Sequence, residues 1–91
     1  MMKGKMKIDN MFVVETNHFK ERRKERGVTL NQVEHSLRGK IRQIRMYRSL
    51  SGNEFAYKSG GLTIIFEIIH NTIKLITAID KEAYVKDAII I

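Results

Sequence analysis

Two long apolar stretches joined by a short polar turn constrain the fold of this chain most. The stretches cover residues 62–70 and 73–79, and both are rich in isoleucine. Asn71-Thr72 between them is typical of a tight two-residue hairpin turn, which places Phe66 opposite Thr77. The second half of the chain is therefore expected to fold around an antiparallel hairpin.

The alternation of side chains along this hairpin predicts the core. The reverse face is also largely apolar, and either the C-terminal segment or a partner is needed to cover it. The face expected to form the core carries Leu62, Ile64, Phe66, Ile68, Ile73, Leu75, Thr77 and Ile79.

Two helices are predicted before the sheet. The first follows an N-cap at Thr16 or Asn17 and ends where Gly27 supplies a left-handed backbone conformation. The second begins with a capping box at residues 29–32 and is short and amphipathic. Both helices are expected to cover the core face of the sheet.

The remaining elements complete an α+β domain. Residues 41–50 and 54–58 alternate like strands and precede the hairpin, while residues 81–86 fit a short final helix. We expect residues 1–10 to form a flexible basic arm and residues 11–91 to form one domain. The expected fold has two N-terminal helices packed on a curved antiparallel sheet of about four strands, with a short C-terminal helix.

The charge distribution predicts a polyanionic partner. The net charge is +7, and residues 1–48 carry 13 lysines and arginines against 5 acids, whereas residues 49–91 carry 4 against 5. A field concentrated in one half favours nucleic acid first and an acidic protein second. Solubility alone is the simpler explanation.

The composition excludes several other classes of protein. The chain has no cysteine, so disulfides and thiolate nucleophiles are absent, and a reducing cytoplasm is the expected location. Its three histidines are far apart and its acids are not clustered, so we expect neither a metal nor another cofactor. The longest apolar run is far shorter than the roughly 20 residues of a membrane helix, so no membrane association is expected.

The first predicted helix carries the strongest candidate site. A step of about 100° per residue brings His18, Arg22 and Arg26 within roughly 80° of one another on one stripe. Phe19 lies beside this stripe and is the only large apolar side chain of the helix, so this side is expected to meet the body of the protein. Solvated salt bridges are the alternative role for such a charged helix.

The sequence His18-Phe19-Lys20-Glu21-Arg22-Arg23-Lys24-Glu25-Arg26-Gly27 resembles the opening of a family of small bacterial and phage domains. These domains are grouped with ribonuclease toxins of the barnase, EndoU, colicin and RelE fold type, and BrnT-type toxins share a similar outline. The resemblance covers roughly residues 16–80, and residues 60–65 and 76–78 match its later strands loosely. It implies a metal-independent ribonuclease, or a nucleic-acid binder derived from one, with His18, Arg22, Arg26 and Thr77 as site residues.

Metal-free RNA cleavage needs a base, an acid and fixed cations around the phosphate. Histidine suits either proton-transfer role near neutral pH, and arginine grips two phosphate oxygens at once. His18 is the first proton-transfer candidate. Tyr57 and His70 are candidates for the second, although core packing and a plain strand-end position explain them as well. Thr77 is either a phosphate-orienting residue or a β-branched core residue.

Further cations are candidates for holding the nucleic acid. No acid interrupts the basic segment from Arg38 to Arg48, which on an edge strand would follow a phosphate backbone while Tyr47 or Tyr57 stacks on a base. Charged edge strands also prevent aggregation, which is the alternative explanation. The candidate nucleic-acid-binding residues are Arg23, Arg42, Arg45, Arg48 and Lys58.

The leading hypothesis is a toxin-like, metal-independent endoribonuclease that uses the 2′-hydroxyl to attack the adjacent phosphate. The alternative is a non-catalytic basic module, such as a phage or plasmid regulator, that binds nucleic acid or a host protein. RNA is the expected ligand, with a neutralising antitoxin or host protein as a further partner. The second sheet face and the tail at residues 89–91 indicate a homodimer.

Overall fold

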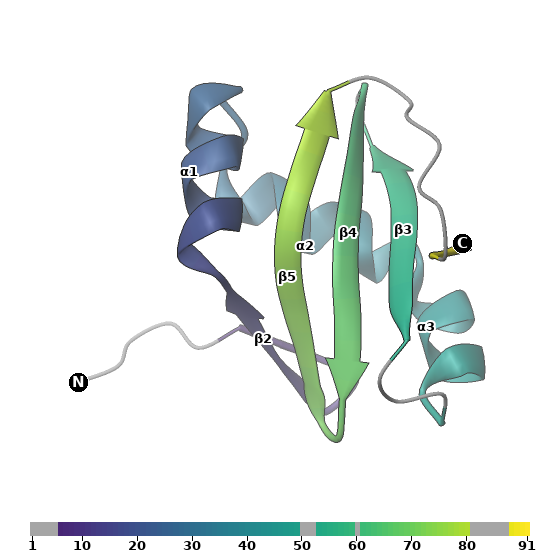
Figure 1. Ribbon diagram of the computed structural model, residues 1–91. Coiled ribbons are helices and arrows are strands. Elements are labelled where there is room, and N and C mark those ends of the chain that lie inside the picture. Colours follow the sequence, from purple (N-terminus) through teal and green to yellow (C-terminus); the bar gives the residue numbers. More distant parts are fainter. Residues whose placement is uncertain (1–5, 50–52, 60, 81–87) are drawn as a thin grey trace.

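A long β-hairpin forms the centre of the computed structural model, which describes residues 6–49, 53–59, 61–80 and 88–91 (Figure 1). As predicted, β4 (Leu62–Ile69) pairs antiparallel with β5 (Thr72–Asp80). Over the described residues the sheet has six strands in the order β1-β2-β5-β4-β3-β6. The other strands are β1 (Met6–Ile8), β2 (Met11–Glu15), β3 (Glu54–Ser59) and β6 (Ile89–Ile90).

The α+β class is confirmed, but the sheet differs from the expected one of about four antiparallel strands. The described chain forms a mixed sheet, because β2 runs parallel to β5 and β6 runs parallel to β3. Strand β1 lies inside the predicted flexible arm, so the arm cannot extend to residue 10. The C-terminal isoleucines add β6 to the edge of β3. The predicted helix at 81–86 lies outside the described residues.

The hairpin turn falls one residue earlier than predicted. His70 and Asn71 form it, Ile69 pairs with Thr72, and His70 adopts a left-handed φ of 54°. Phe66 therefore lies opposite Leu75, and the predicted pairing of Phe66 with Thr77 is wrong.

A β-bulge in β5 changes the face on which Thr77 lies. Phe66 pairs with Leu75, but the preceding residue, Ile65, pairs with Thr77, so Ile76 is an extra residue in β5. One extra residue reverses the alternation of the side chains that follow. The prediction that Thr77 and Ile79 belong to the core face is therefore wrong. Ala78 takes the core-facing place.

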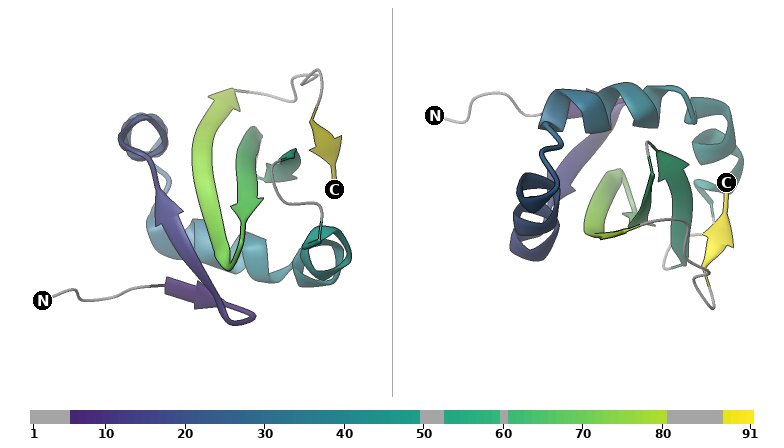
Figure 2. Two further views of the ribbon diagram at one scale, coloured as in Figure 1. Left: turned by 60° about the horizontal axis from the view of Figure 1, so that its bottom comes forward. Right: turned by 90° about the horizontal axis from the view of Figure 1, so that it is seen from above.

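Helices α1 (Asn17–Glu25) and α2 (Leu30–Arg38) occur where the capping residues predicted them. Thr16 caps α1, Gly27 follows it with a φ of 71°, and both hydrogen bonds of the α2 capping box are present. Figure 2 shows that α2 lies across one face of the sheet, whereas α1 stands beside β5. The expected arrangement, with both helices on one face, is thus only partly correct.

The third helix, α3 (Ile41–Tyr47), replaces a predicted strand. Ile44 is fully buried and Ile41 and Tyr47 are half-buried, which is the i, i+3, i+6 spacing of one helix face. The same segment also alternates like a strand, but packing of Tyr47 on Phe55, with ring centroids 5.7 Å apart, favours the helix. In this segment tertiary contacts therefore outweigh the local preference for a strand.

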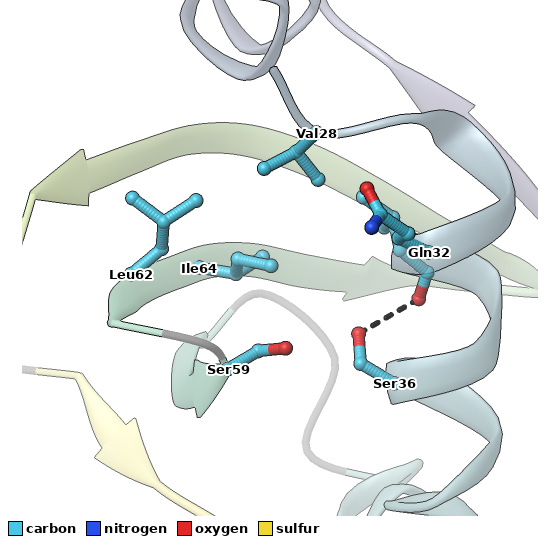
Figure 3. Close-up of a pocket in the computed structure, with 7 residues that line it drawn as sticks. Val28, Gln32, Ser36, Ser59, Leu62 and Ile64 are labelled. Atoms are coloured by element: carbon cyan, nitrogen blue, oxygen red, sulfur yellow. Dashed lines mark hydrogen bonds between the residues drawn. The ribbon is translucent and has the colours of Figure 1, made fainter. Parts of the chain in front are cut away.

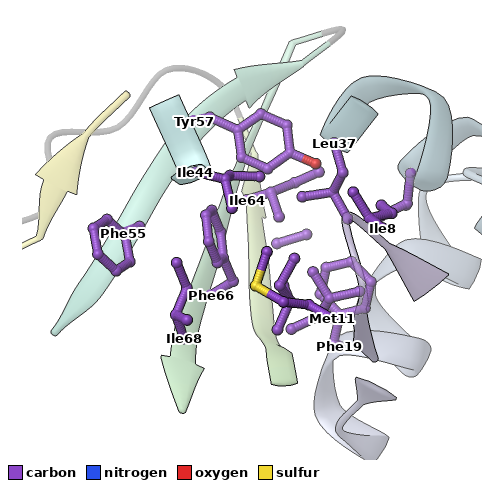
Figure 4. Close-up of a cluster of buried hydrophobic side chains, with 14 of the residues drawn as sticks. Ile8, Met11, Phe19, Leu37, Ile44, Phe55, Tyr57, Ile64, Phe66 and Ile68 are labelled. Atoms are coloured by element: carbon purple, nitrogen blue, oxygen red, sulfur yellow. The ribbon is translucent and has the colours of Figure 1, made fainter. Parts of the chain in front are cut away.

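The core lies between the sheet and the helices (Figure 4). Phe66 is fully buried, with its ring centroid 5.5 Å from that of Phe55 and 5.9 Å from that of Tyr57. No helix in the described part of the chain is long and apolar enough to cross a membrane. Apart from Thr77 and Ile79, the predicted core face is buried: Leu62, Ile64, Phe66, Ile68, Ile73 and Leu75.

Candidate functional site

A concavity of about 220 Å³ lies between α1 and the last part of β5. We call it the α1–β5 site. Arg22 and Arg26 line it from the helix, and Thr77, Ala78 and Ile79 line it from the strand. The structure thus brings together three of the four residues that the family resemblance implied.

Thr16 determines where this concavity forms. The pairing of β2 with β5 ends at Glu15 and Leu75, and the Thr16 N–H then donates to the Leu75 carbonyl at 3.1 Å. The Thr16 hydroxyl donates to the carbonyl of the bulge residue Ile76 at 3.0 Å and accepts from the Phe19 N–H at 3.0 Å. One side chain therefore joins the bulge to the start of α1, and the helix takes the place of β2 beside β5.

The twist of the helical stripe explains which of its residues line the site. Each step of four residues turns the side chain by about 40°, so in angle around the helix axis Arg26 is nearest to the buried Phe19 and His18 is furthest from it. His18 is exposed, does not line the concavity, and lies one helical turn before Arg22. The predicted convergence therefore holds for the two arginines, with His18 at the margin.

The charges at the α1–β5 site are accessible to a ligand. Arg22 pairs with Glu25 at 3.6 Å, and their side chains are 44% and 56% exposed. Exposed ion pairs contribute about 0–1 kcal/mol, so a phosphate can displace this carboxylate at little cost. Arg26 is also exposed.

Arg23 faces the protein interior and is not available as a nucleic-acid contact. Its guanidinium donates to both carboxylate oxygens of Glu15 at 2.9 and 3.0 Å and to the Val28 carbonyl at 3.2 Å. The Glu15 hydrogen bonds raise the pKa of Arg23, which is only 9% exposed. Its position four residues after Phe19 was the sequence signal that it shares the buried face of α1.

Tyr57 is likewise excluded as the second proton-transfer group. It lies on the core face beneath α2, is 1% exposed, and its hydroxyl is 2.8 Å from the Ser36 hydroxyl. Burial raises the pKa of Tyr57 to about 12, although the Ser36 hydrogen bond opposes the rise. His70 lies in the β4–β5 turn, at the opposite end of β5 from the site and roughly 20 Å away along the strand.

Alkaline pH is expected to destabilise the fold through Tyr57. An ordinary phenol ionises near pH 10, whereas Tyr57 in the fold has a pKa of about 12. The contribution of Tyr57 to the free energy of unfolding is fully present below about pH 10 and is lost as the pH rises through about 12. The loss reaches about 3 kcal/mol. In urea titrations, Tyr57→Phe should reduce the fall in unfolding free energy over this range. Tyr47→Phe, which leaves Tyr57 in place, should retain the wild-type fall, and equal slopes for all three proteins would contradict the assignment.

The second predicted group of cations is not gathered at the α1–β5 site. Arg45 donates to both oxygens of Asp9 at 3.0 Å, and Arg48 lies 3.8 Å from Asp9 and donates to Asn71 at 2.7 Å. The Arg45 hydrogen bond holds the pKa of Asp9 below its usual range. These contacts tie α3 to the turns at one end of the sheet. Because this segment is a helix, the predicted edge strand that follows a phosphate backbone is wrong.

Arg42 and Lys58 are exposed on α3 and β3, away from the residues that line the α1–β5 site. Their predicted contacts with nucleic acid stay predictions. Over the described ranges, no three His, Asp or Glu side chains gather in a way that could hold a metal ion.

Comparisons with known proteins add no assignment. A scan against protein-family models, a search of curated proteins and a search of solved structures each found no match. Any function proposed for the protein therefore depends on the geometry of the α1–β5 site.

Proposed function

We propose that this protein is a small, toxin-like, metal-independent endoribonuclease whose α1–β5 site holds a backbone phosphate. The observation that carries the proposal is that Arg22, Arg26 and Thr77 line one concavity. Two guanidiniums and a hydroxyl can all donate to the two non-bridging oxygens of one backbone phosphate, since each of these oxygens accepts more than one hydrogen bond. The same contacts strengthen as charge builds up on the phosphorus in the transition state.

His18 is the proposed proton-transfer residue. It lies four residues, about 6 Å along the axis, before Arg22 on the same stripe, and there it would meet the ribose attached to a bound phosphate. Its imidazole takes the proton of the 2′-hydroxyl, and the 2′-oxygen then attacks the phosphorus. The bond to the 5′-oxygen breaks, that oxygen takes a proton from water, and His18 returns its proton to the solvent, which gives a 2′,3′-cyclic phosphate and a 5′-hydroxyl.

The second candidate function is binding of nucleic acid without cleavage. It is favoured by the chemistry of the five lining residues, since none of them transfers a proton near neutral pH. Tyr57, the second acid predicted from the sequence, is buried in the core beneath α2 and does not line the α1–β5 site. In such a binding protein, Arg22 and Arg26 hold the RNA, and His18 only adds a polar contact.

A cleavage assay separates these two functions. The wild type should cleave labelled RNA in the presence of EDTA, and His18→Ala should lower the rate by about 100-fold or more, the usual value of a general base. His35→Ala, which removes an exposed histidine from α2, is the matched control and should cleave at the wild-type rate.

The other outcomes are equally informative. Equal cleavage by wild type and His18→Ala removes His18 from the mechanism. Salt-dependent binding without any cleavage leaves the non-catalytic function standing. Binding that is weak and insensitive to salt contradicts both functions, because phosphate contacts release counterions.

A ribonuclease of this kind would act in the cytoplasm and would need a neutralising partner. Such an antitoxin or host protein would carry acidic groups to match the exposed cations of α1. A homodimer is proposed through the C-terminal tail or through the second face of the sheet, on which Phe12 and Val14 of β2 are 40% and 44% exposed. Sedimentation of wild type against Val14→Lys would show whether this surface associates.

A further inference from the structure

A second hollow, of about 160 Å³, lies between α2, the end of β3 and the start of β4 (Figure 3). We call it the α2–β4 hollow. Among the residues that the structure describes, no charged side chain lines it, in contrast to the α1–β5 site. Its lining residues are Val28, Gln32, Val33, Ser36, Ser59, Leu62 and Ile64.

The two hollows adjoin. Arg26 lines the α1–β5 site and Val28 lines the α2–β4 hollow, and residues two apart in a chain lie within about 7 Å of each other. In the sheet, Ala78 of the first is paired directly with Ile64 of the second. The linings of the two hollows are therefore neighbours in both the chain and the sheet.

Arg23 holds the turn that separates them. Its side chain donates to the Val28 carbonyl at 3.2 Å, and its own carbonyl accepts from the Val28 N–H at 2.8 Å. Because the Glu15 carboxylate fixes the guanidinium in turn, the position of Val28 is set before any ligand binds.

The polar groups of the hollow offer directed hydrogen bonds between apolar walls. The amide oxygen of Gln32 accepts from the Thr29 N–H at 2.8 Å, which leaves the amide NH₂ to donate to a ligand. The Ser36 hydroxyl donates to the Val33 carbonyl at 2.9 Å and lies 2.8 Å from the Tyr57 hydroxyl, which leaves one lone pair of its oxygen to accept from a ligand. Val28, Leu62 and Ile64 supply flat apolar contact.

We infer that the α2–β4 hollow binds the base of the nucleotide whose phosphate sits in the α1–β5 site. A donor beside an acceptor, between apolar walls, suits the hydrogen-bonding edge and the faces of a planar base. The volume is below the roughly 300 Å³ of drug-sized ligand sites and fits a single base. A base whose edge enters the hollow cannot be paired, so the substrate class is single-stranded RNA. This inference rests on the proposed RNA function.

Base-carrying and abasic oligonucleotides of equal length test the inference. The probes are a 2′-O-methyl oligouridylate, which lacks the attacking hydroxyl, and the same backbone without bases. The wild type should bind the base-carrying probe about tenfold more tightly, because the abasic probe lacks the apolar and hydrogen-bonding contacts with the hollow. Ser59→Leu fills the hollow and should bring the two affinities to within about twofold.

Controls separate loss of the hollow from loss of the fold. Ser49→Leu places the same side chain at an exposed position of the described chain and should keep the tenfold preference. Val28→Phe fills the hollow from the opposite wall and should act like Ser59→Leu if that variant unfolds.

Each remaining result is decisive. Equal wild-type affinity for both probes overturns the base site but leaves phosphate binding intact. A preference that persists in both filled variants, folded by circular dichroism, places the base elsewhere and overturns the assignment. Failure of the wild type to bind either probe overturns the proposed RNA function and this inference together.

Discussion

Replacing Arg22 and Arg26 together by alanine is expected to lower the affinity for single-stranded RNA by about 100-fold. Both side chains line the α1–β5 site, and each hydrogen bond to a charged group contributes about 1.5–3 kcal/mol. The slope of log affinity against log salt should also fall by roughly 1, because one phosphate contact is lost. Fluorescence anisotropy at several salt concentrations measures both quantities.

The matched control removes the same charge from the other side of α1. Lys20 and Lys24 are exposed on the same helix, but neither lines the concavity. Lys20→Ala/Lys24→Ala should lower the affinity only a few-fold, through the general field of the domain. Equal losses for the two double variants would show that RNA is attracted by net charge and is not held at the α1–β5 site.

Replacing Arg23 by alanine is expected to lower the free energy of unfolding by about 3 kcal/mol. The change leaves the Glu15 carboxylate, whose side chain is only 17% exposed, without its partner, and removes the donor to the Val28 carbonyl. Breaking one partner of a nearly buried ion pair costs several kcal/mol, more than the pair itself contributes. Urea unfolding followed by circular dichroism measures the loss.

Two comparisons identify the cause of this loss. Arg22→Ala breaks an exposed ion pair on the same helix and should cost no more than about 1 kcal/mol. Glu15→Leu combined with Arg23→Met removes both charges and should recover part of the lost stability. A cost for Arg23→Ala as small as that for Arg22→Ala would mean that the Glu15 contact is not maintained in solution.

Much of the architecture could be predicted from local patterns. Thr29 and Gln32 mark the start of α2 through a capping box, and Gly27 supplies the left-handed residue after α1. The predicted core residues of β4 are buried, although Thr63 and Ile65 on the reverse face are buried as well. These features depend on residues within about four positions of one another, so the linear sequence contains all the information that they require.

The third helix and the position of Thr77 could not be predicted in this way. Residues 41–47 fit both a strand and a helix, and contact between Tyr47 and Phe55 favours the helix. The bulge at Ile76 reverses the direction of Thr77, and it is held by Thr16, a residue 60 positions earlier in the chain. Both results depend on residues that approach one another only in the folded state.

The α1–β5 site shows most clearly which features depend on local sequence and which depend on tertiary contacts. The sequence by itself determined that His18, Arg22 and Arg26 lie on one stripe of a helix, because helical periodicity is local. Only the tertiary structure decided that Arg22 and Arg26 face the strand while His18 stays at the margin. Tertiary contacts also turned Arg23 inward to Glu15. A guanidinium carries the same charge in every position, so its role depends on whether the fold buries it against a carboxylate, as with Arg23, or leaves it exposed, as with Arg22.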